Sequence, residues 1–371
     1  MANGSCWLLR ARRCQAGWRK PLARKPYVAD SFFSLSKAEQ WEALEFGRAE
    51  SGRPTHLFEK DIWVVWTLRT LFASPLAADL TFKGGTSLSK VYKVIDRFSE
   101  DVDLTYDIRK LIPDLIGAGS ELPGSRSQAS KWTQAVRHRL PDWITQAVQP
   151  VLQAALANER LDVQLELGGQ DRDKLFLRYP ALTQGTGYVA PVVTLEFGGR
   201  ATGEPHQACA VTCDIAEHLT EVSFPAATPL VMSVARTFWE KATAAHVFCA
   251  QGRIRGERYA RHWHDLAAIS RSPAFSAVVG DQAVAEVVAR HKSCFFIEKD
   301  AFGMAIDYMA AATGNLKIVP EGKALEALAK DYEAMLADDL MVGDAMHFDA
   351  LMDACAELEV TMNGVARRQK K

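Results

Sequence analysis

The sequence predicts an α+β protein in three consecutive parts: helices first, a core of helices and strands next, and helices again at the end. Apolar residues at helical spacing over 36–47 and 57–72 predict the first part. Short apolar segments punctuated by glycine between 161 and 215 predict strands in the second part. The spacing becomes helical again from residue 226, which predicts a helical third part.

Composition narrows the class of protein. The chain of 371 residues is 48% hydrophobic and 24% charged, which is typical of a soluble globular protein, and no apolar run reaches the length of a membrane span. The seven cysteines are scattered and odd in number, which favours a reducing compartment such as the cytoplasm over a disulfide framework. We expect a basic extension over 1–25, a core with N-terminal helices over 26–225 and a helical domain over 226–371.

Charge is distributed unevenly along the chain. Residues 1–25 contain seven Lys or Arg and no Asp or Glu, and they lack the apolar segment of a secretory signal. We expect this extension to be disordered or to reflect an upstream start codon. The rest of the chain has 37 basic and 45 acidic residues. This balance argues against general nucleic-acid binding, so any RNA contact must be local.

Two helices are expected before the core. Ser36 and Glu39 have the spacing of a capping box, which predicts the start of the helix over 36–47. Thr55 is a start signal for the helix over 57–72, whose apolar residues cover a broad face. The first turn of this second helix carries Glu-Lys-Asp at 59–61, which we expect to be solvated.

The stretch 80–106 predicts a strand, a glycine turn, a short helix and a second strand, in that order. The glycine pair at 84–85 allows backbone angles and close approaches that a side chain would block. The hydroxyl pair at 86–87 supplies N-cap candidates for a helix that reaches Ile95. Apolar and polar residues alternate over 102–105, which predicts the second strand.

This order of elements suits nucleotide chemistry. The amides of a glycine turn that opens a helix point at incoming anions, and the helix dipole favours phosphate there. Asp101 and Asp103 project to the same face of a strand, where two like charges repel unless a cation joins them. Carboxylate oxygens suit Mg²⁺, which commonly binds one or two of them plus substrate phosphates. Together the motifs predict a metal-bound triphosphate site, although either motif alone is more often a plain turn or a solvated strand edge.

The remaining pattern is that of a loop, a long helix, four strands and further helices. Residues 112–130 are rich in Gly, Ser and Pro and predict the loop. The later elements are expected at 132–158 with an interruption at Pro141, 161–167, 174–179, 189–197, 208–215, 231–250, 323–336 and 347–362.

Two motifs resemble those of a known family. Residues 84–90 read GGTSLSK and residues 97–104 read RFSEDVDL. This pair resembles the signature of the AbiEii/AbiGii toxin family, within the DNA polymerase β-like nucleotidyltransferase superfamily. The likeness is specific over 81–106 and weaker from about 59 to about 266. It implies a polymerase β-like core, with a mixed sheet and helices, between the N-terminal helices and the C-terminal helical domain.

The strand expected at 189–197 carries a further candidate. Glu196 is an isolated acid in an apolar strand, and a two-metal transfer site usually has a third carboxylate on a neighbouring strand. Arg200 follows a glycine pair and is a candidate phosphate clamp. The alternative for Glu196 is a solvent-facing strand residue.

The helix over 231–250 and the segment after it supply the next candidates. The resemblance assigns Lys241 to nucleotide phosphates; the alternative is a solvated Lys241 beside an ion pair between Arg236 and Glu240. The family has Arg-Asp near its active site in the following segment. This chain has His264-Asp265 there, so Asp265 is retained without the adjacent arginine.

A basic cluster lies between the Lys241 helix and Asp265. Its local positive field predicts a footprint for the phosphate backbone of an RNA acceptor, and the alternative is a solvated loop. Nearby histidines follow no metal-ligand spacing. The cluster consists of Arg253, Arg255, Arg258 and Arg261.

We therefore expect a metal-dependent nucleotidyltransferase that uses an NTP with Mg²⁺ or Mn²⁺ and releases pyrophosphate. The resemblance implies a tRNA 3′ end as acceptor, a toxin role in a toxin–antitoxin or phage-defence pair, and a separate antitoxin partner. The alternatives are nucleotidylation of a protein hydroxyl, and a non-catalytic module that binds a nucleotide or a partner. The expected metal ligands are Asp101, Asp103 and Glu196, and the expected phosphate contacts are Lys83, Gly84, Gly85, Thr86, Ser87, Arg200 and Lys241.

Overall fold

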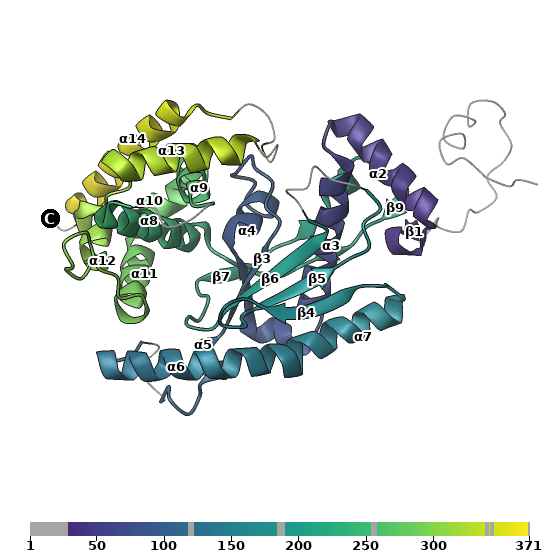
Figure 1. The fold of residues 1–371 in the computed structure, drawn as a ribbon, viewed down its shortest axis with the longest axis horizontal. Helices are drawn as coiled ribbons and strands as arrows, with labels where there is room; N and C mark the ends of the chain where they lie inside the picture. The colour runs from purple at the N-terminus through teal and green to yellow at the C-terminus, as the bar shows by residue number, and fades with distance from the viewer. Residues whose placement is uncertain are drawn as a thin grey trace, which may run out of the picture.

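The computed structural model describes residues 29–117, 122–183, 190–253, 258–337, 341 and 345–369. A mixed sheet lies in the middle of the molecule, with a long helix along one side and a group of helices from the C-terminal half beside it (Figure 1). The expected extension over 1–25 lies outside the described residues.

The central sheet has seven described strands in the order β4-β5-β6-β3-β2-β11-β7. Two neighbouring pairs, β3 with β6 and β2 with β11, are parallel, and the others are antiparallel. The expected mixed sheet is therefore confirmed. The strands are β2 (Leu80–Lys83), β3 (Val102–Tyr106), β4 (Gln164–Gly168), β5 (Lys174–Arg178), β6 (Val192–Gly198), β7 (His206–Ala208) and β11 (Leu230–Met232).

Short elements flank this sheet. Two small pairs of strands, β1-β9 and β10-β8, lie apart from it. They and the short helical turns are β1 (Asp30–Ser31), η1 (Phe32–Ser34), η2 (Pro75–Asp79), β8 (Val211–Thr212), η4 (Asp214–Glu217), β9 (Val222–Ser223) and β10 (Ala226–Ala227).

The two N-terminal helices form as expected. Helix α2 (Lys37–Ser51) begins at a capping box in which Ser36 and Glu39 bond each other's backbone amides. Helix α3 (Thr55–Phe72) is buried along most of its length, and Ile62, Trp66 and Leu68 are fully inaccessible to solvent. Helix α3 is therefore a central part of the core rather than a surface helix.

Helix α4 (Gly84–Lys90) starts earlier and ends earlier than expected. Its N-cap is Lys83, and the two residues proposed as caps lie inside its first turns. The Thr86 hydroxyl donates to the Asp101 carbonyl and the Ser87 hydroxyl donates to the Gly84 carbonyl, so neither caps a helix end. The backbone then leaves the helix and reaches positive φ at Lys93, so the expected continuation to Ile95 was wrong.

The long helix under the sheet is not interrupted at Pro141, contrary to expectation. Pro141 lies inside α6 (Arg126–Trp143), which continues through a π-helical stretch, η3 (Ile144–Val148), into α7 (Gln149–Glu159). Pro141 lacks a backbone N–H, yet the helix continues through it and widens to a π turn three residues later. Helix α6 also begins within the segment expected to be a loop, and α5 (Ile108–Leu111) precedes it.

The C-terminal part is helical from Val234, not from Ala226, because β10 and β11 intervene. It has its own apolar core, separate from the core formed by the sheet, α3, α6 and α7. The helices are α8 (Val234–Gln251), α9 (Ala260–Ser270), α10 (Phe275–Gly280), α11 (Gln282–Phe295), α12 (Tyr308–Ala310), η5 (Ala311–Asn315), α13 (Gly322–Ala337) and α14 (Phe348–Gln369).

The central sheet has one face that packs on α6 and an opposite face that carries polar residues. A side chain at Gly199 would meet Leu111, Val136 and Leu140, so odd-numbered positions near the end of β6 point toward α6. The even-numbered positions point to the opposite face, which carries the polar residues.

Candidate active site

Four charged side chains form a row across the polar face of the sheet. Backbone register places Lys83 of β2 opposite Asp103 of β3, Asp103 opposite Glu196 of β6, and Glu196 opposite Lys174 of β5. Directly opposite residues share a face and lie within side-chain reach. The strands therefore bring two of the expected metal ligands, Asp103 and Glu196, side by side between two lysines.

Asp103 packs against the glycine turn. Gly84 has φ of +78°, and a side chain there would collide with the Asp103 carboxylate. The absence of a side chain at Gly84 therefore allows the turn and the acid to touch. Burial, opposed by Lys83 and reinforced by Glu196 and Asp101, raises the pKa of Asp103 to about 6. The protein alone therefore supplies too little positive charge around Asp103 to bring its pKa down to the ordinary value of an aspartate.

Asp101 lies just before β3 and is half-buried. Burial and the neighbouring Glu100 raise the pKa of Asp101, while Arg258 and Arg261 act in the opposite direction. Glu196 is more exposed and pairs with Lys174 at 2.7 Å. The three expected ligands thus lie on one side of the sheet, but their surroundings differ.

The residues fit a divalent cation that is completed by substrate oxygens. Asp103 and Glu196 offer hard oxygen donors on adjacent strands, and the raised pKa of Asp103 shows where an added cation would be stabilising. Among the described residues, no three His, Cys, Asp or Glu side chains gather closely enough to form a protein-only metal site. A Mg²⁺ ion commonly binds one or two carboxylates plus phosphates, which matches this arrangement.

The two glycines of the turn face different side chains: Gly84 faces Asp103, and Gly85 faces Arg97 and Ser99. A side chain at Gly85 would lie 2.6 Å from Nη2 of Arg97 and 2.7 Å from the Ser99 hydroxyl. Gly85 is thus required for the close approach of Arg97. The hydroxyls of the next two residues, Thr86 and Ser87, are buried and bonded to protein groups, so only backbone amides of the turn remain to contact a phosphate.

Lys241 and Asp265 form one buried network with an arginine that the sequence did not reveal. Arg97 donates two hydrogen bonds of 2.8 Å to the Asp265 carboxylate. The Lys241 ammonium lies 2.9 Å from the same carboxylate. Burial raises the pKa of Asp265, but Arg97 and Lys241 outweigh it and hold that pKa well below its usual range. Asp265 is therefore a fully ionised anchor.

Asp265 is completely inaccessible to solvent, so it cannot touch a substrate directly. It holds Lys241, which influences the charge of Asp103, and Arg97, which lines the glycine turn. Arg97 is thus the arginine that pairs with Asp265 in this chain. Its only signal was its position in the RFSEDVDL motif, four residues before Asp101.

A family comparison now decides the assignment. The model of a family described as "Nucleotidyl transferase AbiEii toxin, Type IV TA system" matches residues 66–354. The chain belongs to this AbiEii family. The match includes the glycine turn, the acid row and the Arg97–Asp265–Lys241 network. A nucleotide substrate and an antitoxin partner follow from membership of a toxin–antitoxin nucleotidyltransferase family.

Two solved structures are similar to this AbiEii-family chain. MenT4, a nucleotidyltransferase toxin from Mycobacterium tuberculosis, aligns over 90% of this chain and 99% of its own, with 19% identity and a TM-score of 0.36. JHP933 from Helicobacter pylori aligns over 84% of this chain and 93% of its own, with 12% identity and a TM-score of 0.38. At these TM-scores, the family match alone carries the assignment. No curated protein matches significantly.

The Glu-Lys-Asp turn of α3 is buried, so the expectation that it is solvated was wrong. Each of its side chains holds a different segment. Glu59 accepts hydrogen bonds from the backbone of Leu182 and Thr183, and Lys60 pairs with Glu100 at 2.6 Å. Because Glu100 directly precedes Asp101, Lys60 fixes the approach to β3.

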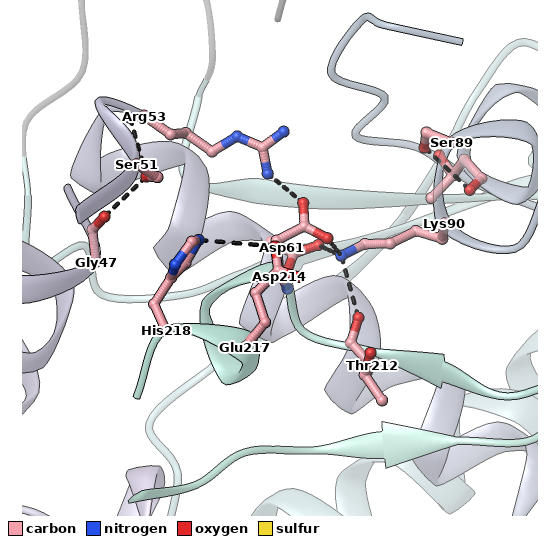
Figure 2. Close-up of polar contacts among 11 residues, drawn as sticks. Gly47, Ser51, Arg53, Asp61, Ser89, Lys90, Thr212, Asp214, Glu217 and His218 are labelled. Atoms are coloured by element: carbon pink, nitrogen blue, oxygen red, sulfur yellow. Dashed lines mark hydrogen bonds and ion pairs between the residues drawn. The ribbon is translucent and has the colours of Figure 1, made fainter. Parts of the chain in front are cut away.

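Asp61 belongs to a buried charge network at the far end of α4 (Figure 2). The Lys90 ammonium pairs with Asp61 and with Asp214, at 2.7 Å in the second case, and also donates to the Thr212 carbonyl. Arg53 completes the network by pairing with Asp214. The glycine-turn helix is thus held at its start by the Gly84 contact and at its end by Lys90.

The expected RNA cluster is only partly described. Arg255 lies outside the described residues, and Arg253 is exposed. Arg258 pairs with Glu100 at 2.7 Å, and both Arg258 and Arg261 influence the charge of Asp101. Arg258 and Arg261 therefore lie at the end of the site where β3 begins.

The remaining candidates lie on α8 and just past β6. Arg236 pairs with Glu240 at 3.3 Å, which confirms the ion pair considered as an alternative for this helix. Lys241, however, is not solvated, because it pairs with Asp265. Arg200 lies just past the end of β6 and packs on the Phe296 ring.

No described helix is long and apolar enough to cross a membrane.

Proposed function

We propose that the protein transfers a nucleoside monophosphate from a metal-bound NTP to an acceptor hydroxyl and releases pyrophosphate. The observation that carries this proposal is the in-register Lys83–Asp103–Glu196 row beside the glycine turn. Family membership supplies the transfer class, and the row supplies the groups that such a transfer requires.

The side chains have separate roles in this proposal. Asp103, with Asp101 and Glu196, holds Mg²⁺ or Mn²⁺, which supplies charge neutralisation for the reacting phosphate when bound. Lys83 and Lys241 neutralise the charge that develops on the leaving pyrophosphate. The backbone amides of Gly84 and Gly85 contact the triphosphate. Glu196, whose side chain is partly exposed, accepts the proton of the acceptor hydroxyl in this proposal.

The acceptor in this proposal is RNA, and specifically the 3′ end of a tRNA, as the resemblance implies. The toxin would act in the cytoplasm in a toxin–antitoxin or phage-defence pair. The described arginines near Asp101 support a polyanionic acceptor.

The test combines the purified protein with each labelled NTP, Mg²⁺ and either total RNA or total protein. We expect label to enter RNA of tRNA size with wild type, and Asp103→Ala to abolish incorporation while the variant stays folded. Equal incorporation by the variant would overturn the site. Label in protein instead of RNA would overturn the acceptor but leave the transfer chemistry standing.

A further inference from the structure

Two positive charges, Arg200 just past the C-terminal end of β6 and Lys292 of α11, lie close together. Arg200 follows Glu196 by four residues, and His291 of α11 bonds the Arg200 carbonyl at 2.8 Å. Burial lowers the pKa of His291 to about 3, so the ring is neutral and donates this bond. The position of Arg200 is thereby fixed against the C-terminal helices.

Two cations share one aromatic ring at this position. The Arg200 guanidinium lies 4.5 Å from the centre of the Phe296 ring, and the Lys292 ammonium lies 4.4 Å from it. Both side chains are half-buried. Within the described part of the chain, neither has a carboxylate at ion-pair distance. The ring attracts both cations but supplies no negative charge to neutralise them.

The carboxylate that acts on Lys292, Glu240, is already shared by other cations. Glu240 lies 3.8 Å from Lys83 and 3.3 Å from Arg236. Burial raises the pKa of Glu240, yet Lys83, Lys292 and Arg236 outweigh burial and lower it to about 2. Burial and the neighbouring cations lower the pKa of Lys292 against the attraction of Glu240. Three cations, Lys83, Lys292 and Arg236, thus act on this one carboxylate. The acids that act on Arg200 are Asp171 and Asp173, and neither lies within ion-pair distance of it.

Half-buried positive charges without a carboxylate at ion-pair distance predict an anionic ligand. A phosphate group is the natural ligand, because arginine and lysine bind it by charge-assisted hydrogen bonds. The strand directions indicate whether this phosphate belongs to the NTP or to the acceptor. The glycine turn follows β2, which runs antiparallel to β3, so the turn lies where β3 begins. Arg200 lies past the other end of the same strands, where Ala201 bonds Ile108.

We propose that Arg200 and Lys292 form a phosphate subsite for the backbone of the acceptor polynucleotide, with Arg200 past the strand ends opposite the glycine turn and Lys292 between Arg200 and the Lys83–Glu240 pair. This inference rests on the proposed function, because it assumes a nucleic-acid acceptor. Arg258, which the sequence favoured for this role, is already paired with Glu100, whereas Arg200 and Lys292 lack such a partner among the described residues.

The experiment measures binding of a single-stranded RNA oligonucleotide and of total tRNA across NaCl concentrations. The variants are Lys292→Gln, Arg200→Gln and, as a charge-conserving variant, Lys292→Arg. Arg290→Gln is the matched control, since Arg290 is on the same helix but exposed and paired with Glu286. Thermal unfolding of each variant and calorimetric binding of Mg²⁺–NTP are measured in parallel.

We expect Lys292→Gln and Arg200→Gln to bind RNA several-fold more weakly. The slope of log affinity against log salt should fall by about 0.7 for each lost phosphate contact to a single strand. Lys292→Arg and Arg290→Gln should bind RNA like wild type, and all variants should bind the NTP normally.

Three results would overturn this assignment. Unchanged RNA binding by both glutamine variants would show that the cations do not contact the acceptor. Loss of NTP affinity with normal RNA binding would assign the subsite to the triphosphate. A wild type that binds no RNA at any salt concentration would refute the acceptor subsite. The Asp103→Ala labelling test would still decide the transfer chemistry separately.

Discussion

Asp103 and Asp265 are carboxylates in one site with opposite electrostatic surroundings. Burial, Glu196 and Asp101 raise the pKa of Asp103 to about 6, and the nearby Lys83 only partly offsets them. Asp265 is more deeply buried, yet Arg97 and Lys241 hold its pKa well below its usual range. Depth of burial therefore does not decide the charge state; the supply of cations does.

This difference separates a ligand-binding acid from an anchoring acid. The protein satisfies Asp265 completely, with two hydrogen bonds from Arg97 and an ion pair from Lys241. It leaves Asp103 short of positive charge at a position that a substrate can reach. The two aspartates should therefore respond in opposite ways to the same substitution.

The largest expected effect is that of Asp103→Asn on activity. The substitution removes a carboxylate that we assign to the metal, so transfer of labelled NMP should fall by roughly a thousandfold or more. The folded pKa of Asp103 lies above the unfolded value, so ionisation at pH 7 costs stability, and the variant should unfold at the same or a higher temperature. A variant that keeps its activity, or that unfolds at a clearly lower temperature, would contradict this.

Asp265→Asn should show the reverse pattern. Removing the charge leaves Arg97 and Lys241 buried without their partner, which typically costs about 3–5 kcal/mol. The folded pKa of Asp265 is depressed, so its stabilising effect is present above the unfolded pKa and is lost as pH falls. Urea unfolding at pH 7 measures the loss. A loss below that of an ordinary surface substitution would show that the network is not an anchor.

Local patterns predicted the parts of this site that neighbouring residues determine. The capping box at Ser36 depends on a short spacing and forms at the start of α2 as expected. Asp103 lies on β3, while Asp101, which we expected on the same strand, lies directly before it. The pairing of Arg97 with Asp265 joins residues 168 apart in the chain, so no spacing rule could reveal it.

Burial explains most of the other positions at which the structure differs from the sequence-based expectation. The Glu-Lys-Asp turn at 59–61 looked like a solvated helix start, but each side chain found a partner on another segment. Thr86 looked like a cap, but its hydroxyl is bonded to the Asp101 carbonyl in the interior. A polar residue has the same local signal whether it faces water or a distant partner, so tertiary contacts must decide between the two.

Glu240 is a third buried carboxylate of this region, and cations lower its pKa as they do that of Asp265. The substitution Glu240→Gln tests how much this charge stabilises the protein. The folded pKa of about 2 lies below the ordinary value, so Glu240 stabilises the protein above about pH 4.5 and loses this effect as pH falls toward 2. We expect a loss of roughly 3 kcal/mol at pH 7 because Lys83 and Arg236 lose their shared partner. The difference from wild type should shrink in unfolding measurements below pH 4. A difference independent of pH would contradict the ionic origin.

The smallest expected effect on stability is that of alanine at Gly84. Comparison with alanine at Gly52 separates backbone strain from the contact with Asp103. Gly84 and Gly52 have nearly equal φ values, +78° and +77°, so alanine at either position pays a similar backbone cost of about 1 kcal/mol. A side chain at Gly52 meets nothing within 4 Å, whereas one at Gly84 collides with the Asp103 carboxylate. Gly52→Ala is therefore a matched control for backbone strain alone.

We expect both alanine variants to lose about 1 kcal/mol in urea unfolding, with Gly84→Ala losing somewhat more. Only Gly84→Ala should lose nucleotidyl transfer, because the added methyl group displaces Asp103 from its place beside Glu196. Gly85→Ala would not isolate this effect, since its side chain would meet Arg97 and disturb the Asp265 anchor. If Gly84→Ala transfers NMP as fast as Gly52→Ala, then the position of Asp103 against the turn does not matter for the reaction. The distinction between the two aspartates would then have to rest on charge alone.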